Sequence, residues 1–192
     1  MSLKVYLVLL ALLAVERLSE LLRAASNRRW ALARGAVESG HGVHRLMVTF
    51  HCLFFVSCAA ETVLFRPPFP GWLGWLALVV ALLAQALRAW VIATLGPRWN
   101  TRVLVVPGLA PVRAGPYCWI RHPNYLAVAL EIVAVPLIHG CWRTALSFSL
   151  MHIPLLAARI RVEERAMGPG YQDLMDRQPR FVPRSSRPRS AP

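Results

Sequence analysis

A stretch of 21 residues without a charged side chain, from Pro67 to Leu87, constrains this sequence more than any other feature. Crossing a hydrocarbon core of about 30 Å takes a helix of about 20 apolar residues. The whole chain has 56% hydrophobic and only 16% charged residues, whereas soluble domains carry about a quarter charged residues. The sequence therefore excludes a disordered chain and favours an all-α integral membrane protein over a soluble helical one.

Four further apolar runs are short or carry ionisable residues, yet each is a candidate span. Together they predict five spans, at residues 3–22, 46–65, 67–95, 124–139 and 142–159. The last two flank a tight turn and form a helical hairpin, while the fourth is short for a full crossing, which leaves a tilted or partly re-entrant segment open. A single domain over residues 1–178 and a disordered basic tail over residues 179–192 follow.

The net charge of +13, from 22 Lys and Arg against 9 Asp and Glu, is divided unequally between the loops. Alternating spans place 17 basic residues on one side and only Lys4, Arg66 and Arg143 on the other. The positive-inside rule then puts the N-terminus outside and the C-terminus in the cytoplasm. The charge thus reports topology. It predicts contact with anionic membrane lipids and no binding of nucleic acid.

Charged residues also interrupt the apolar runs themselves. Glu16 and Arg17 follow the first apolar core directly, where a signal peptide would have small residues, so this run is interpreted as a retained anchor. A polar stripe at 4-3-4 spacing follows on the same helix and is expected to tie helices together; its members are Glu16, Glu20, Arg23 and Asn27. The isolated polar residues His51, Glu61, His139 and His152 are expected to form hydrogen bonds within the bundle. The four cysteines form no CxxC pair and have no zinc spacing, so no metal site is predicted.

The longest loop between predicted spans, residues 96–123, leads into Arg121-His122-Pro123-Asn124-Tyr125. Pro123 suits the first position of a helix, and His122 and Tyr125 can face the same side of its first turn. A helix N-terminus presents backbone N–H groups and the positive end of its dipole. A carboxylate or another anion is therefore a natural ligand at this place.

Two motifs resemble the isoprenylcysteine carboxyl methyltransferase family. The first is Gly115-Pro116-Tyr117 followed by Arg121-His122-Pro123-Asn124-Tyr125, and the second is the charged exit of the last span, from Arg159 through Glu163-Glu164 to Arg165. The resemblance covers roughly residues 75–170. Trp99-Asn100-Thr101-Arg102 and Leu130-Glu131 are most similar to the bacterial branch often paired with type III polyketide synthases.

The resemblance implies methyl transfer from S-adenosylmethionine to a lipophilic acceptor with an acidic oxygen, in the inner membrane of a bacterium. A long-chain alkylpyrone or alkylresorcinol is the first expectation, with functional pairing to a polyketide synthase, and an isoprenylcysteine carboxylate is the second. Arg159 and Glu163 are implied as catalytic residues that face one another on the last helix. The implied cofactor-binding residues are Gly115, Pro116, Tyr117, Arg121, His122, Pro123, Tyr125 and Glu164.

Glu131 is a third candidate catalytic residue, because ionisable groups inside a membrane are costly and usually functional. It is expected to contact the acceptor or act as a base, or else to pair with Arg88 or a histidine. Two other functions stay open from the sequence: a membrane sterol-type reductase using NADPH, and a non-catalytic membrane adapter that acts through its basic tail. The soluble methyltransferase fold is not expected, since no glycine-rich turn follows a strand.

Overall fold

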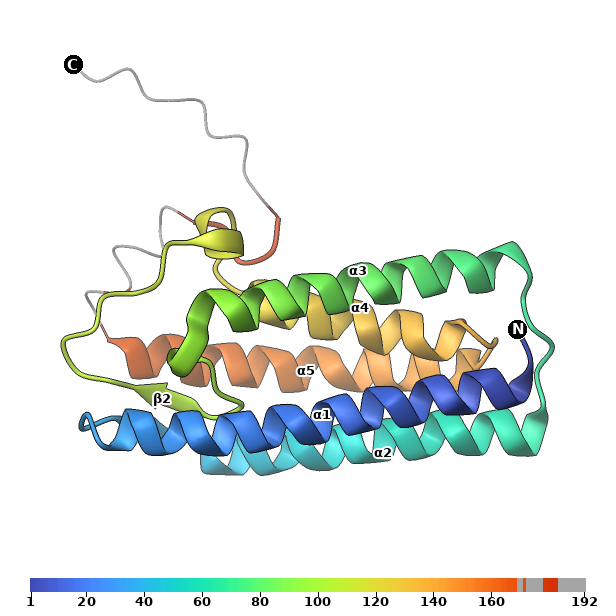
Figure 1. Ribbon diagram of the computed structural model, residues 1–192, viewed down its shortest axis with the longest axis horizontal. Coiled ribbons are helices and arrows are strands. Elements are labelled where there is room, and N and C mark those ends of the chain that lie inside the picture. The colour runs from blue at the N-terminus through green and yellow to red at the C-terminus, as the bar shows by residue number, and fades with distance from the viewer. Residues whose placement is uncertain (169–170, 172–177, 183–192) are drawn as a thin grey trace, which may run out of the picture.

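The computed structural model describes residues 1–168, 171 and 178–182, and its framework is a bundle of five helices that run side by side (Figure 1). The helices are α1 (Leu3–Leu32), α2 (His41–Phe65), α3 (Trp72–Leu95), α4 (Pro123–Leu137) and α5 (Trp142–Met167). Two 3-10 turns, η1 (Gly96–Arg98) and η2 (Gly115–Cys118), and two strands, β1 (Val37–Ser39) and β2 (Val103–Val105), lie in the connections. The expected all-α membrane architecture is confirmed.

Three of the described helices, α2, α3 and α5, are long and apolar enough to cross a membrane. The α1 helix has the length, but Glu16, Arg17 and Glu20 lie in its middle. The α4 helix has 15 residues, or about 22 Å at 1.5 Å per residue, which is short for a full crossing. Five crossings therefore remain a prediction for α1 and α4, although both run along the other three helices (Figure 1).

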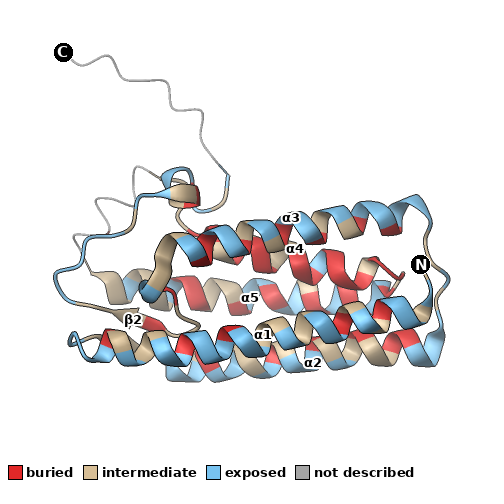
Figure 2. Cartoon of the chain, viewed as in Figure 1, coloured by how far each residue is buried: buried red, intermediate tan, exposed pale blue. Residues whose placement is uncertain are grey.

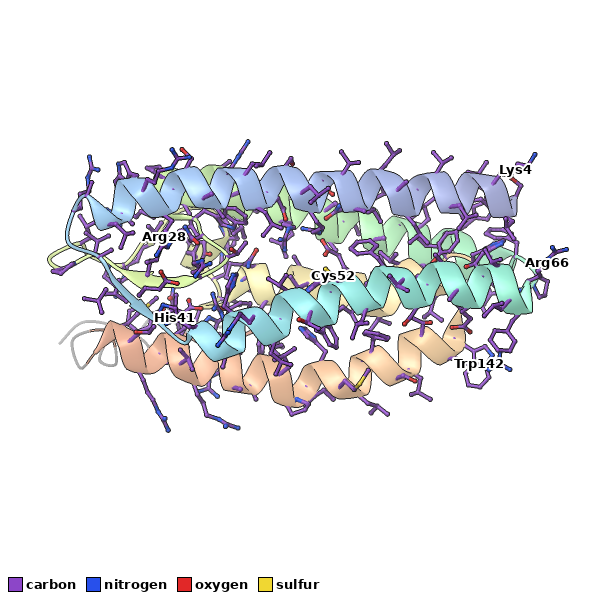
Figure 3. The ribbon with its side chains drawn as sticks, turned by 90° about the horizontal axis from the view of Figure 1, so that it is seen from below. Lys4, Arg28, His41, Cys52, Arg66 and Trp142 are labelled. Atoms are coloured by element: carbon purple, nitrogen blue, oxygen red, sulfur yellow. The ribbon has the colours of Figure 1, made fainter. Side chains whose placement is uncertain are left out.

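The two ends of the bundle differ in charge. Lys4, Arg66 and Trp142 lie at one end, whereas Arg28 and His41 lie at the opposite end (Figure 3). The strands, η1 and η2 gather at this second end, which is called the basic end below (Figure 1). Lys4 and Arg66, two of the three basic residues predicted on the less basic side, therefore lie at the same end of the bundle.

Several helix boundaries differ from the predicted spans. The α1 and α5 helices continue to Leu32 and Met167, well beyond residues 22 and 159, because polar turns stay helical after the apolar run has ended. The α3 helix begins only at Trp72, since the prolines at positions 67, 68 and 70 disfavour helix in the residues before them. An apolar run thus locates a span and does not fix the length of its helix.

Small side chains bring α3 and α4 close together. Ala77, Ala81 and Ala84 are buried at helical spacing along α3, and a Cβ on Gly74 would lie 2.8 Å from the Ile138 carbonyl oxygen. Small residues at such an interface let two backbones approach, which is how helices in lipid gain packing energy. Figure 2 shows buried residues on the inward sides of the helices and exposed ones on the outer surface, where many are large and apolar.

A network of charged side chains joins α1 to α3 and α4. The Arg88 guanidinium on α3 donates to both carboxylate oxygens of Glu20 at 2.6 Å. Arg17 donates to Glu20 at 2.7 Å, to Glu131 on α4 at 2.9 Å and to Gln85 at 2.8 Å. The expectation that the polar stripe of α1 ties elements together is confirmed for Glu16, Glu20 and Asn27, whereas Arg23 is exposed. Glu131 pairs with Arg17 rather than with Arg88 or a histidine, because α1 brings Arg17 between the acidic groups.

Replacing Glu20 with Gln leaves the buried Arg88 guanidinium and the partly buried Arg17 guanidinium without their shared carboxylate. Breaking a buried ion pair on one side costs about 3–5 kcal/mol, so Glu20→Gln is expected to lower the apparent melting temperature in detergent by several degrees. Ser19→Ala is the matched control, since Ser19 is exposed on the same helix and its hydroxyl bonds only the local Glu16 carbonyl. Equal melting temperatures for the two variants would contradict this account.

Candidate functional site

A cavity of about 600 Å³ lies toward the basic end of the bundle. Its walls come from α1, α2, the first turns of α4, the last turns of α5, β2 and the loop from residue 97 to 112. This volume falls within the range of about 300–1,000 Å³ that is usual for small-molecule sites. The RHPNY motif and the charged end of α5 both reach it, although they are separated by more than 30 residues in the chain.

Tyr125 connects the two motifs at the cavity wall. Its hydroxyl donates to the Glu163 carboxylate and accepts a hydrogen bond of 3.0 Å from Arg159 Nε. Arg159 was expected to face Glu163 directly, four residues along the same helix. The structure instead joins them through the Tyr125 hydroxyl, because Pro123 starts α4 at a depth that places its first turn against α5.

Arg159 is only 4% exposed, and two of its three side-chain nitrogens have hydrogen-bond partners. Nε donates to Tyr125, and Nη2 donates to the Thr101 carbonyl at 2.9 Å. Nη1 is buried and has no hydrogen-bond partner in the described part of the chain. A buried donor without a partner costs about 1–3 kcal/mol, more when it is charged, so this atom favours an anionic or polar ligand in the cavity.

Aromatic rings and a second carboxylate support the same wall. The His122 ring stacks on Tyr125 with centroids 5.4 Å apart, and its Nε2 lies 3.1 Å from Glu164. Glu164 also accepts from Arg180 at 2.7 Å and so links α5 to the chain after it. Burial, with the nearby Glu163 carboxylate as a second cause, raises the pKa of Tyr117 above its ordinary value, so its phenol stays protonated.

The predicted site residues divide into two groups. Six of them line the cavity: Tyr117, Arg121, His122, Tyr125, Arg159 and Glu163. The other five, Gly115, Pro116, Pro123, Glu131 and Glu164, are absent from its wall and lie behind it. Glu131 reaches the cavity only through Arg17, which does line it. Its catalytic role stays a prediction, as does the role of the whole set in binding a cofactor.

Gly115 lies behind the wall for a steric reason. Its φ is +54°, and a Cβ there would lie 2.4 Å from Thr94 Oγ1 on α3. The glycine therefore lets η2 pack directly on α3 and carry Tyr117 to the cavity. Pro123 also has a structural role, because it is the first residue of α4, where the missing N–H of proline costs no hydrogen bond.

The first residues of the predicted disordered tail are part of the site. The backbone N–H groups of Arg121 and His122 donate to the carbonyls of Pro179 and Arg180, at 3.0 and 3.2 Å. The prediction of disorder from residue 179 is wrong for residues 179–182, because these carbonyls satisfy backbone donors just before α4. Residues 183–192 lie outside the described residues.

Sequence reasoning missed two residues at the centre of the cavity wall. The Thr101 carbonyl accepts from Arg159, and His44 Nδ1 lies 3.1 Å from the same oxygen. Thr101 belongs to the motif Trp99-Asn100-Thr101-Arg102, but it acts here through its backbone carbonyl, a role that side-chain identity does not reveal. His44 lies just before a predicted span, and the only available signal was its position on the face of α2 that Met47, His51 and Phe55 continue.

Comparison with known proteins agrees with this geometry. The isoprenylcysteine carboxyl methyltransferase (ICMT) family matches residues 75–169, which comprise α3, α4, α5 and the loop between α3 and α4. The chain is 40% identical over 160 residues to "Uncharacterized protein YpbQ" of Bacillus subtilis (strain 168), covering 83% of this chain and 94% of the relative. The chain belongs to the ICMT family.

Members of the ICMT family are membrane methyltransferases that depend on S-adenosylmethionine. A second relative, an "Uncharacterized protein" of Haemophilus influenzae (strain ATCC 51907 / DSM 11121 / KW20 / Rd), is 27% identical over 137 residues, or 71% of this chain and 79% of the relative. Both relatives extend beyond the family match. The ICMT match omits α1 and α2, which nevertheless supply much of the cavity wall.

The β1–β2 pair forms part of the cover over this ICMT site. Its antiparallel register pairs Val37 with Val105. The middle residue of β1, Glu38, accepts hydrogen bonds from Arg28 at 2.8 Å and from Arg102 at 2.5 Å. Burial by itself raises the pKa of Glu38, but the hydrogen bonds from Arg102 and Arg28 outweigh it, and the pKa is lowered. Glu38 therefore stays ionised and cross-links α1 to β2.

Glu38→Gln is expected to speed hydrogen exchange in residues 97–112 about threefold at neutral pH, since partly exposed ion pairs contribute up to about 1 kcal/mol. The folded pKa lies below the ordinary value of about 4.3, so the stabilisation is complete above that pH. It is lost as the pH falls through the lowered folded value, where the wild type should approach the variant. Ser39→Ala is the control, and equal exchange in all three proteins at pH 7 would refute the cross-link.

Proposed function

We propose that this protein is an S-adenosylmethionine-dependent O-methyltransferase of a bacterial inner membrane, acting on a lipophilic acceptor with an acidic oxygen. The observation that carries the proposal is Arg159, which lines the cavity and whose buried Nη1 has no partner among the described residues. The family membership supplies the reaction class, and the cavity residues supply the reason for an anionic or polar ligand.

The residues present fit the cofactor. S-adenosylmethionine combines aromatic, anionic and cationic parts, and when bound it supplies a methyl group on a sulfonium centre. Aromatic faces of Tyr117, His122 and Tyr125 attract a cation held over them, and the Glu163 carboxylate adds a negative charge on the same wall. We assign these four residues, with Arg121, to the cofactor.

Arg159 is assigned to the acceptor oxygen. Its guanidinium is held by Tyr125 and by the Thr101 carbonyl, so the free Nη1 is positioned before any ligand arrives. A preorganised cation stabilises negative charge that develops on an oxygen in a site sheltered from water. The wall thereby aligns acceptor and cofactor and limits access of water, which are the main requirements of a methyl transfer.

The part of the cavity between α1 and α2 is apolar, which supports a lipophilic acceptor. Leu18 and Leu21 on α1 and Met47, Cys52 and Phe55 on α2 line it. An apolar compartment of this kind suits an alkyl or prenyl tail. A long-chain alkylpyrone or alkylresorcinol is the proposed acceptor class, and a type III polyketide synthase is the class of enzyme that would supply it. An isoprenylcysteine carboxylate is the second acceptor class.

Binding of labelled S-adenosylmethionine to the purified protein in detergent tests the cofactor assignment. The wild type is expected to bind, and a His122→Ala/Tyr125→Ala double variant should bind at least tenfold more weakly, a loss of about 1.4 kcal/mol. Leu150→Ala on the exposed face of α5 is the control and should bind as the wild type does. Absence of binding by the wild type would sink the proposal, and binding of NADPH instead would favour the reductase.

Reporter fusions test the proposed orientation. Alkaline phosphatase, which folds only outside the cytoplasm, is expected to be active when fused after Arg66 and inactive when fused after Gly108. A green fluorescent protein at the same two places should show the opposite pattern, because the basic end is assigned to the cytoplasm. Activity of the phosphatase after Gly108 would reverse the topology.

A further inference from the structure

His44 and Arg159 meet at one backbone oxygen. His44 Nδ1 lies 3.1 Å from the Thr101 carbonyl oxygen, and Arg159 Nη2 donates to that same oxygen at 2.9 Å. Both side chains line the cavity. The imidazole on α2 and the guanidinium on α5 therefore border the same part of the cavity, next to Tyr125.

The contact with Thr101 fixes which nitrogen of His44 carries the proton. A carbonyl oxygen only accepts, so Nδ1 must be the donor in this hydrogen bond. In a neutral imidazole the other nitrogen, Nε2, is then unprotonated and has a free lone pair. His44 is only 8% exposed, and within the described residues Nε2 has no partner. His44 lines the cavity, so the free lone pair of Nε2 is available to a ligand bound there.

The cavity extends along the α2 helix. His44, Met47, His51 and Phe55 line it at helical spacing, and 11 residues from His44 to Phe55 correspond to about 16 Å along the helix. Away from His44, the cavity reaches the lipid-facing surface, because Leu18 and Leu21 both line it and are 61% and 39% exposed. An acceptor with its tail between α1 and α2 therefore presents its polar head to His44 and Arg159.

We propose that His44 Nε2 is the general base of the methyl transfer and that the acceptor is a neutral hydroxyl compound, a phenol or an enol. This rests on the proposed function. A carboxylate is already ionised at neutral pH and needs no base, whereas a phenol or enol must lose its proton as its oxygen attacks. The pairing of a base with Arg159 thus selects one acceptor class from the two left open above.

The step balances as follows. The hydroxyl proton passes to His44 Nε2 while the acceptor oxygen forms a bond to the methyl carbon of a sulfonium donor. The bond between that carbon and sulfur breaks, and its electron pair stays on sulfur, which leaves a neutral sulfide. Arg159 Nη1 stabilises the negative charge that develops on the oxygen. The imidazolium then releases its proton to water, so His44 is regenerated.

His44→Asn is the decisive variant, because the amide nitrogen of Asn can replace Nδ1 as donor to Thr101 while Nε2 is lost. The matched control is Thr49→Asn on the same helix, because the Thr49 side chain is exposed and does not line the cavity. Two acceptors are compared: an alkylresorcinol, and a ring-nitrated alkylresorcinol whose phenol is ionised at the assay pH.

For His44→Asn, kcat/KM with the neutral resorcinol is expected to fall about 10²- to 10⁴-fold, as for the loss of a general base. With the nitrated acceptor it should fall no more than about threefold, and Thr49→Asn should stay within about threefold on both. A loss below threefold on the neutral acceptor, or an equal loss on both acceptors, overturns the assignment. A wild type that methylates only carboxylates also overturns it.

A binding measurement provides a readout independent of turnover. With S-adenosylhomocysteine bound, a chromophoric neutral phenol should shift its absorbance toward the phenolate on entering the wild-type site, and this shift should be absent in His44→Asn. The variant should still bind S-adenosylmethionine as the wild type does. If the wild type does not bind S-adenosylmethionine at all, the proposed function itself fails, whereas normal cofactor binding without the absorbance shift in the wild type refutes only the role of His44.

Discussion

The rest of this structure depends on the ionic network that Arg17, Glu20, Arg88 and Glu131 form between three helices. In hydrocarbon, apolar surface does not drive helices together, so packing and polar contacts must do it. The network attaches α1 to α3 and α4, and α1 in turn holds the loop after α3, since Asn27 donates to the Trp99 carbonyl at 2.7 Å. Without α1 in this place the cavity would lack one side.

The family model matches residues 75–169, whereas the cavity wall also includes residues of α1 and α2. The protein can therefore be divided into a matched part and the two helices before it. Residues 75–169 contain Tyr125, Arg159 and Glu163, the side chains assigned to the reaction. The α1 and α2 helices lie before this segment and line the apolar compartment. Under the proposed function, the side chains assigned to the cofactor lie in the part that the family model matches, and the helices before it line the compartment for the acceptor.

The order of the helices and the place of the site could be predicted from the sequence, because both depend on local patterns. The charge-free run Pro67–Leu87 identifies a span by itself, and Arg121-His122-Pro123 marks the start of α4. The contacts within the site could not be predicted. That Tyr125 lies between Arg159 and Glu163 depends on the depth at which α4 meets α5. Glu131 could be singled out as a charged residue within an apolar run, but its partner depends on where α1 packs.

Residues that contribute through their backbone could not be predicted from the sequence for a related reason. Thr101, Pro179 and Arg180 contribute carbonyl oxygens, which every residue has. The strands β1 and β2 have only three residues each, too few to show alternation, and they pair across more than 60 residues of chain. Such strands form because the helices bring the two segments together. Their own sequences are therefore not sufficient to predict them.

The opening of the cavity between α1 and α2, where Leu18 and Leu21 face lipid, has a kinetic consequence. An enzyme that takes its substrate sideways from the bilayer responds to the mole fraction of substrate among the lipids, and the concentration in bulk solution matters only through partitioning. Adding inert lipid or detergent would slow turnover by dilution in two dimensions, even at constant total substrate. Under the proposed function, the same opening returns the methylated product to the bilayer, so that product accumulates beside the enzyme until lateral diffusion or a next enzyme in the membrane removes it.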